Sequence, residues 1–108
     1  MPQQLTSQQN KYLRSLAHRL KPLVLVGKNG LTAEVIASID AALEKHELIK
    51  LKFIDHKEKE QKKQMIDAIC SQTRCFRAGM IGHTAILYRQ ATKASLRKIK
   101  LPPGSPAS

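Results

Sequence analysis

The residues best suited to chemistry in this sequence are the four of the run Gly27-Lys28-Asn29-Gly30, with Thr32 close behind them. The run follows the apolar stretch Leu23 to Val26 and precedes an amphipathic segment, so it should connect a strand to a helix. Glycines allow a ligand to approach the backbone closely, and a helix N-terminus offers N–H groups to an anion. With Lys28 as a mobile cation, these parts suit a phosphate group. A purely structural turn is the alternative interpretation, and the spacing is too short for a P-loop.

A second set of cations lies on residues 7–20, which are predicted to form an amphipathic helix. Thr6 or Ser7 can cap this helix. Its apolar positions, spaced i, i+3, i+4 and i+7, should face the sheet and the core, and they are Leu13, Leu16, Ala17 and Leu20. The opposite stripe is basic and consists of Lys11, Arg14, His18 and Lys21. Taken alone, such a stripe fits a solvated helix face as well as a binding surface.

The distribution of charge favours the binding surface. The chain of 108 residues carries 19 Lys and Arg against 8 Asp and Glu, a formal net charge of +11. All the acidic residues lie between Glu34 and Asp67, whereas the charged residues in 1–33 and 68–108 are all basic. If the two ends of the chain meet in space, they form one strongly positive surface. Such a surface points to a polyanionic partner, with nucleic acid first and an anionic membrane surface second.

Other kinds of chemistry find little support. Cys70 and Cys75 lack further ligands at metal-binding spacing, so structural thiols are the favoured interpretation, and we expect neither a metal nor a cofactor. The carboxylates near Asp55 alternate with lysines, which is typical of a solvated loop and not of a catalytic pair. We therefore expect no enzymatic activity. The chain has four aromatic residues and no Trp, which disfavours a base-stacking platform and favours recognition of phosphates and RNA shape.

These groups must be positioned by a single domain with the element order α-β-α-β-α-β-β and a four-stranded mixed sheet. Leu23 to Val26 is predicted to be a buried strand, and Thr32 is predicted to cap a helix over residues 32–46. Residues 48–54 alternate as a half-exposed strand, and a third helix over about 57–72 follows. Gly82 and His83 are predicted to form a two-residue hairpin turn between strands 75–81 and 84–89. The chain from Ala91 should be mostly unstructured, ending in a disordered Pro-rich tail over 101–108.

Several stretches in this order resemble one family, the CRM domain (chloroplast RNA splicing and ribosome maturation), in its free-standing bacterial YhbY-like form. The stretches are Leu16-Ala17-His18 through Lys21-Pro22, Val26 through Thr32, His46 through Lys52, and Ile81-Gly82-His83-Thr84 through Leu87-Tyr88-Arg89. The resemblance covers about residues 5–100. It implies an RNA-binding fold similar to the C-terminal domain of bacterial translation initiation factor three. It also implies association with precursors of the large ribosomal subunit and a role in their maturation.

We therefore expect a cytoplasmic, monomeric, non-enzymatic RNA-binding domain over residues 1–100 that has no membrane association. Its RNA would be large-subunit ribosomal RNA or a pre-ribosomal particle. An adaptor with a basic surface for an acidic partner protein is the alternative, and nuclease sensitivity would separate the two. The candidate RNA-binding residues are Gly27, Lys28, Asn29, Gly30, Thr32, Lys11, Arg14, His18 and Lys21.

Overall fold

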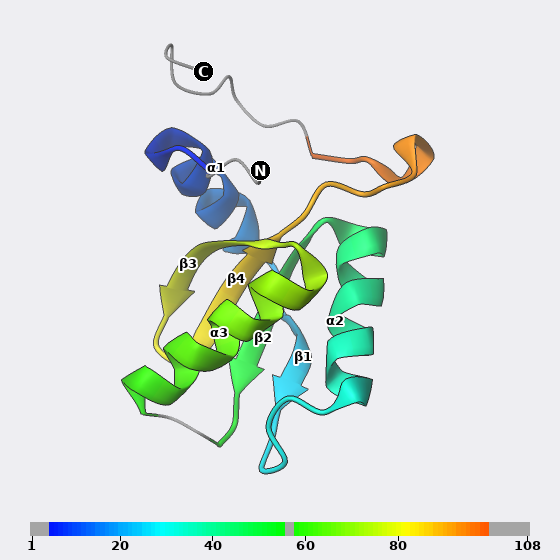
Figure 1. Ribbon diagram of the computed structural model, residues 1–108. Coiled ribbons are helices and arrows are strands. Elements are labelled where there is room, and N and C mark those ends of the chain that lie inside the picture. The colour runs from blue at the N-terminus through cyan, green and yellow to red at the C-terminus, as the bar shows by residue number, and fades with distance from the viewer. Residues whose placement is uncertain (1–4, 56–57, 100–108) are drawn as a thin grey trace.

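The computed structural model describes residues 5–55 and 58–99 (Figure 1). The predicted element order is confirmed, with one 3-10 turn added near the C-terminal end of this range. The elements are α1 (Ser7–Ala17), β1 (Pro22–Val26), α2 (Ala33–His46), β2 (Leu48–Phe53), α3 (Lys59–Thr73), β3 (Phe76–Ile81), β4 (Thr84–Tyr88) and η1 (Ala94–Leu96). The predicted Pro-rich tail over 101–108 and the proposed start of the third helix at residue 57 lie outside the described residues.

The four strands form one mixed sheet, as expected, and their order is β1-β2-β4-β3. β1 and β2 run parallel and are joined through α2, whereas β2–β4 and β3–β4 pair antiparallel. The hairpin between β3 and β4 turns at Gly82 and His83, and Gly82 adopts the positive φ of +58° that favours glycine there. β1 and β3 are therefore the two edges of the sheet.

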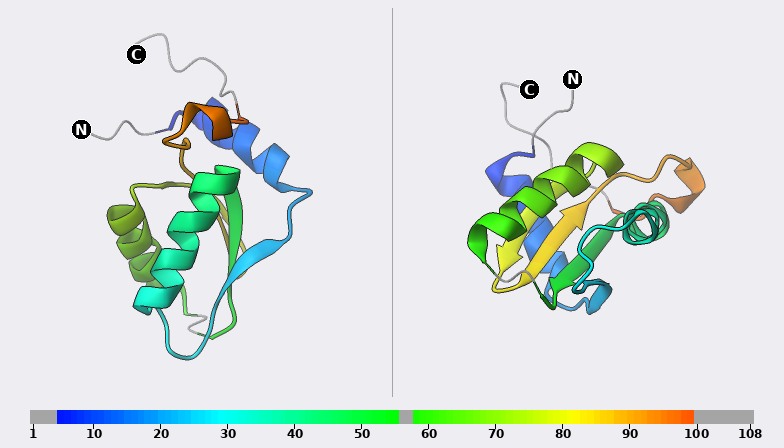
Figure 2. Two further views of the ribbon diagram at one scale, coloured as in Figure 1. Left: turned by 90° about the vertical axis from the view of Figure 1, so that its right-hand side faces the viewer. Right: turned by 60° about the horizontal axis from the view of Figure 1, so that its bottom comes forward.

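Helices cover the two faces of this sheet unequally. α2 and α3 lie on one face, and α1 lies on the other face at one end (Figure 2). The larger core cluster lies under α2 and α3 and includes Ile39, Leu43, Leu51 and Phe53. The smaller cluster lies under α1, where Leu13 and Ala17 pack with residues of the sheet such as Leu48, Ile86 and Tyr88. Within residues 5–55 and 58–99, no helix lies over the part of this second face beyond α1 (Figure 2).

Helix α1 begins as predicted but ends three residues early. Thr6 caps it, since its side chain accepts a hydrogen bond from the Gln9 backbone N–H while the Gln9 side chain accepts one from the Thr6 N–H. The helix stops at Ala17, not at residue 20. Leu13 and Ala17 are fully buried, but Leu16 and Leu20 are each 37% exposed, so the prediction that both leucines face the sheet was wrong. Of the apolar stripe only Leu13 and Ala17, which are spaced i and i+4, are fully buried, because α1 lies over the end of the sheet.

Leu23 to Val26 forms a strand as predicted, but the prediction that this strand is buried was wrong for two of its four residues. β1 is an edge strand with alternating burial: Val24 and Val26 enter the larger core, whereas Leu23 and Leu25 are 55% and 53% exposed. A run of four apolar residues has no period from which the two faces could be told apart. The exposed pair lies on the face that α1 covers only at one end.

Residues 91–99 are ordered, contrary to expectation. Two glutamates hold them against the C-terminal end of α2 through hydrogen bonds that backbone N–H groups donate. Glu44 accepts from Thr92 and Lys93, and Glu47 accepts from Ala91, Lys98 and Ile99. Sequence separations of 44 to 52 residues between these partners explain why no local pattern predicted this order.

Candidate nucleic-acid interface

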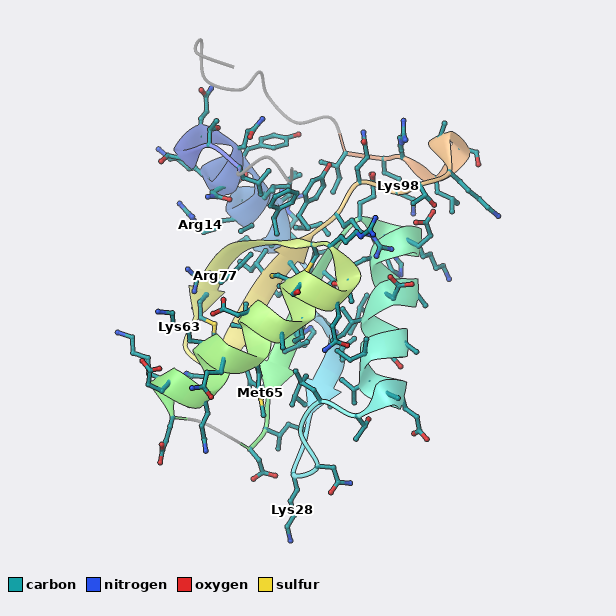
Figure 3. All side chains as sticks on the ribbon, in the orientation of Figure 1. Arg14, Lys28, Lys63, Met65, Arg77 and Lys98 are labelled. Carbon is teal, nitrogen blue, oxygen red and sulfur yellow. The ribbon has the colours of Figure 1, made fainter. Side chains whose placement is uncertain are left out.

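The loop between β1 and α2 has the geometry that the sequence predicted for it. The backbone N–H of Gly30 donates to the carbonyl oxygen of Gly27 at 3.0 Å and closes a tight turn. Gly30 has a φ of +68°, in the region that favours glycine, and it is buried. Lys28 and Asn29 occupy the exposed tip, and Lys28 points away from the body of the molecule (Figure 3). The turn therefore presents a cation at one extreme end of the protein.

Gly27 is a glycine for which neither backbone strain nor crowding gives a reason. Its φ lies outside the positive region, and a Cβ atom added to it would meet nothing within 4 Å. The space beside its backbone is open. A glycine in that situation allows another chain, such as a nucleic-acid backbone, to approach closely.

The helix that follows the loop begins as predicted. The Thr32 side chain accepts a hydrogen bond from the backbone N–H of Val35 at 3.1 Å, so its hydroxyl oxygen is already engaged in capping α2. The positive end of the α2 dipole consequently points toward the loop, where it favours an anion. Thr32 thus contributes through the placement of the helix end.

The predicted cations of the first helix lie far from this loop. α1 and the loop occupy opposite ends of the molecule, so the nine candidate residues do not form one compact patch (Figures 1 and 3). Lys11 and His18 are exposed on or just after α1, while Lys21 lies beside the C-terminal segment around a hollow that also includes Lys98. The N-terminal and C-terminal basic segments therefore meet at the end of the protein away from the loop.

Arg14 is fixed across the edge of the sheet. Its Nη1 donates to the carbonyl oxygen of Ala78 at 3.1 Å, and its aliphatic stem crosses Gly79 of β3. A Cβ atom on Gly79 would lie 2.6 Å from the Arg14 Cδ, so the glycine leaves the space that the stem occupies. Arg14 remains exposed, and its guanidinium stays at the sheet edge.

Two lysines that were not among the candidate residues link the two ends of the protein. Lys50 and Lys52 of β2 pair with Ile86 and Thr84 of β4, and Ile86 still belongs to the cluster under α1. Lys52 is exposed and pairs with Leu25 of the edge strand on its other side. The alternation of lysines with buried Leu51 was visible in the sequence, but only the folded structure shows that Lys52 is exposed whereas Lys50 is partly buried.

A third group of cations borders a groove between α3 and the hairpin. The groove has a volume of about 670 Å³, and its basic lining residues are Lys59, Lys62, Lys63 and Arg77. Lys62 donates to the carbonyl oxygen of Gly82 at 3.1 Å and is thereby held against the hairpin turn. Arg77 and Lys63 lie near each other on the side where Arg14 also lies (Figure 3).

Arg89, one of the basic residues in the C-terminal third of the chain, makes its contacts within the protein. The Arg89 guanidinium forms ion pairs with Asp40 and Glu44 and also donates to the carbonyl oxygens of Thr73 and Asp40. Its side chain is only 14% exposed. Arg89 therefore joins α2 to α3, and its charge is neutralised within the protein.

The two cysteines are free and lie side by side. Their sulfur atoms are 3.6 Å apart, with Cys75 in the larger core and Cys70 packed against it. Contact with the Cys70 sulfur lowers the pKa of Cys75 to about 7, while the same contact and burial raise the pKa of Cys70. In the described ranges, no three His, Cys, Asp or Glu side chains gather as a metal site requires.

Comparison with known proteins identifies the family to which the chain belongs. The family model of the CRS1/YhbY (CRM) domain matches residues 5–89. The chain belongs to the CRM domain family. An RNA-binding protein of Haemophilus influenzae is 43% identical over 98 residues, which is 91% of this chain and 95% of that protein. The Bacillus subtilis "Probable RNA-binding protein YqeI" is 37% identical over 98 residues, covering 91% of this chain and 99% of the relative.

A solved structure supports the same family fold. The solution structure of a Staphylococcus aureus protein, for which RNA binding has been suggested, matches with a TM-score of 0.77 at 35% identity. The match covers 91% of this chain and 99% of the other. The CRM domain described here is thus an α/β domain whose free-standing bacterial relatives are named as RNA-binding proteins. None of the helices in the part of the chain that the structure describes is long and apolar enough to cross a membrane.

Proposed function

We propose that this CRM-domain protein binds the phosphate backbone of RNA and assists the assembly of the large ribosomal subunit. The observation that carries the proposal is the loop Gly27–Gly30, which combines an open glycine backbone, an exposed lysine and the N-terminal end of α2. These are the parts that a phosphate requires. RNA is the polyanion that the names of the relatives indicate.

The proposed contact surface begins at the loop and continues along the open face of the sheet. Lys52 and then Lys50 follow from the loop toward Lys21, because the register places Leu25 beside Lys52 and Pro22 beside Lys50. Phosphates spaced along one RNA strand or one groove can meet these cations in turn. Association with precursor particles is what the CRM family resemblance implies, and it completes the proposal.

The decisive variant is Lys28→Asp combined with Asn29→Asp. It replaces one positive charge by two negative ones at the loop tip and leaves both glycines and the Thr32 cap in place. We expect affinity for structured ribosomal RNA to fall at least tenfold, or by about 1.4 kcal/mol, through like-charge repulsion. The melting temperature should hardly change, because neither residue is buried. A titration at fixed salt and a melting curve measure the two effects.

The cellular part of the proposal needs a separate measurement. In sucrose gradients the wild-type protein should sediment with precursor large subunits and move to the top of the gradient after RNase treatment. The doubly substituted variant should stay at the top even without RNase. A matched control is Lys45→Gln, on an exposed position of α2 that lies outside the proposed surface. Normal RNA affinity of the well-folded double variant would make the loop a structural turn only. Sedimentation that resists RNase would instead indicate a protein partner.

A further inference from the structure

A hollow with apolar walls lies where the two ends of the chain meet. Its volume is about 390 Å³, within the range of pockets that hold small ligands, about 300–1,000 Å³. The end of α1, the start of β1 and the C-terminal segment all contribute to it, through Leu16, Leu20, Leu23 and Ile99 among others. Neither the loop Gly27–Gly30 nor the lysines of β2 take part, so this site shares only Lys21 with the surface proposed above.

The walls of the hollow expose aliphatic side chains that a soluble domain would normally bury. Leu16 and Leu20 are 37% exposed, and Leu23 is 55% exposed. Single exposed leucines are common, but three large ones gathered in one concave place indicate a binding site. Because α1 ends at Ala17, the chain from there to β1 is free to place Leu20 and Lys21 beside the opening.

One wall is held in place by an unusual residue. Glu47 is fully buried, and its φ of +65° is a conformation that residues other than glycine rarely adopt. Its Oε1 accepts hydrogen bonds from the backbone N–H groups of Lys98 at 2.6 Å and Ile99 at 2.9 Å. A buried carboxylate is costly unless it is fully hydrogen-bonded. Glu47 therefore fixes the backbone of the two residues whose side chains border the hollow.

The charge around the opening is of one sign. Lys21 and Lys98 border it from two different segments, and none of the described residues that line it is acidic. An apolar interior with cations at its border fits a ligand that has a flat, weakly polar part and negative charge beside it. A nucleotide within an RNA strand has that form, since each base is flanked by two phosphates.

We propose that this hollow receives one unstacked base of single-stranded RNA while the phosphates on either side of that base contact Lys21 and Lys98. The inference deepens the proposed RNA binding and rests on it. A base is held here between aliphatic side chains and not on an aromatic platform. The absence of an acidic group and the scarcity of polar ones in the lining make the site tolerant of base identity. An amphipathic helix of an acidic protein fits less well, because it needs a groove long enough for anchors at i, i+4 and i+7.

The test compares a short oligouridylate with an abasic ribose-phosphate chain of the same length, which keeps every phosphate and lacks every base. The wild-type protein should bind the oligouridylate about fivefold more tightly, in keeping with the contribution of one partly buried base. Leu23→Thr should abolish this preference. Leu25→Thr is the matched control, since Leu25 is equally exposed on the same strand but does not line the hollow. Lys98→Gln should weaken binding of both oligonucleotides and leave the preference intact.

Each other outcome overturns the inference in a distinguishable way. Equal binding of the two oligonucleotides by the wild-type protein would exclude a base site and leave backbone binding standing. Binding of neither oligonucleotide nor structured RNA would remove the proposed function as well. A melting temperature lowered by Leu23→Thr alone, with the preference kept, would assign the hollow to the chain's own residues beyond Ile99. Loss of an RNase-resistant protein partner in Leu23→Thr, with RNA binding unchanged, would assign it to an acidic protein.

Discussion

Gly27 and Gly30 lie on either side of the loop tip and look equivalent in the sequence, but they have different physical roles. Gly30 is required by the fold because its φ is +68° and its N–H closes the turn. Gly27 is under no such constraint, and the space beside it is empty. The sequence predicted the loop and the Thr32 cap because both depend on neighbouring residues. It could not separate the two glycines, since backbone angles and open space are properties of the folded molecule.

Alanine at each glycine should therefore give opposite results. Gly27→Ala should leave the free energy of unfolding unchanged or raise it by about 0.4–1 kcal/mol, because the folded backbone accepts a side chain there and the unfolded chain loses entropy. Its RNA affinity should fall, since the methyl group occupies the space where a phosphate backbone passes. Gly30→Ala should lose about 1 kcal/mol or more of stability through the strained φ. Denaturant titrations and RNA titrations of both variants check this, and undiminished affinity in Gly27→Ala would argue against close approach at that residue.

At the scale of single elements, the burial of helix α1 illustrates what periodicity can and cannot determine. The apolar stripe identified the helix and its inner face, and Leu13 and Ala17 are indeed buried. The stripe did not indicate how much of its length finds a partner. That depends on where α1 crosses the sheet, and α1 reaches only the end formed by residues such as Leu48 and Tyr88. Leu16, in the outer part of the stripe, therefore stays partly exposed and lines the hollow.

Alanine substitutions along α1 should reflect this division. Leu13→Ala should lower the free energy of unfolding by about 2–5 kcal/mol, as expected for a fully buried leucine that leaves a cavity. Leu16→Ala should lower it by less than about 1 kcal/mol, because the side chain is already partly in water. Urea unfolding curves of the two variants, fitted with a common slope, measure the difference. Similar losses at both positions would mean that Leu16 is packed more tightly than its exposure indicates.

The C-terminal segment depends on two acidic side chains, and its stability should depend on pH. Burial by itself would raise the pKa of Glu47, but the N–H groups of Ala91, Lys98 and Ile99 outweigh it, so this pKa lies below the ordinary value of 4.5. The pKa of Glu44 is lowered too, because its carboxylate accepts hydrogen bonds from the backbone of Thr92 and Lys93. A carboxyl group with a lowered pKa in the folded state stabilises that state at pH values above 4.5, and this contribution is lost as the pH falls through the folded-state value.

Glu47→Gln should accordingly destabilise the protein at neutral pH by about 1–3 kcal/mol, since charge-assisted hydrogen bonds are replaced by weaker ones. The difference from the wild type should shrink as the pH falls below about 4.5. Hydrogen exchange at the amides of Lys98 and Ile99 should accelerate in the variant, whereas exchange in β2 and β4 should change only with global stability. Glu58→Gln is the control, because Glu58 is exposed and its side chain makes no capping hydrogen bond. A pH-independent difference would show that Glu47 acts through shape and not through charge.

At the scale of the whole molecule, the distribution of charge along the chain does not reveal where the basic residues lie in the fold. The acid-free chain ends do meet around Lys21 and Lys98, but the loop with Lys28 lies at the opposite end. Arg89 is neutralised by Asp40 and Glu44, so it adds nothing to the outer surface. The separation between loop and helix arises because β1 runs from one end of the sheet to the other, which no count of charges along the chain can reveal.

The spread of cations over the surface determines how RNA affinity should respond to salt. If about five phosphates are contacted, the slope of log K against log salt concentration should be about −3 to −4, since each contact with single-stranded RNA contributes about −0.7. Lys52→Gln should reduce the magnitude of this slope by about 0.7, because Lys52 lies on the open sheet face between the loop and Lys50. Lys45→Gln removes the same charge from an exposed position on α2 and should leave the slope unchanged. Titrations at several salt concentrations distinguish the two variants, since a general field effect would alter both slopes equally, whereas a contact along the sheet alters only the first.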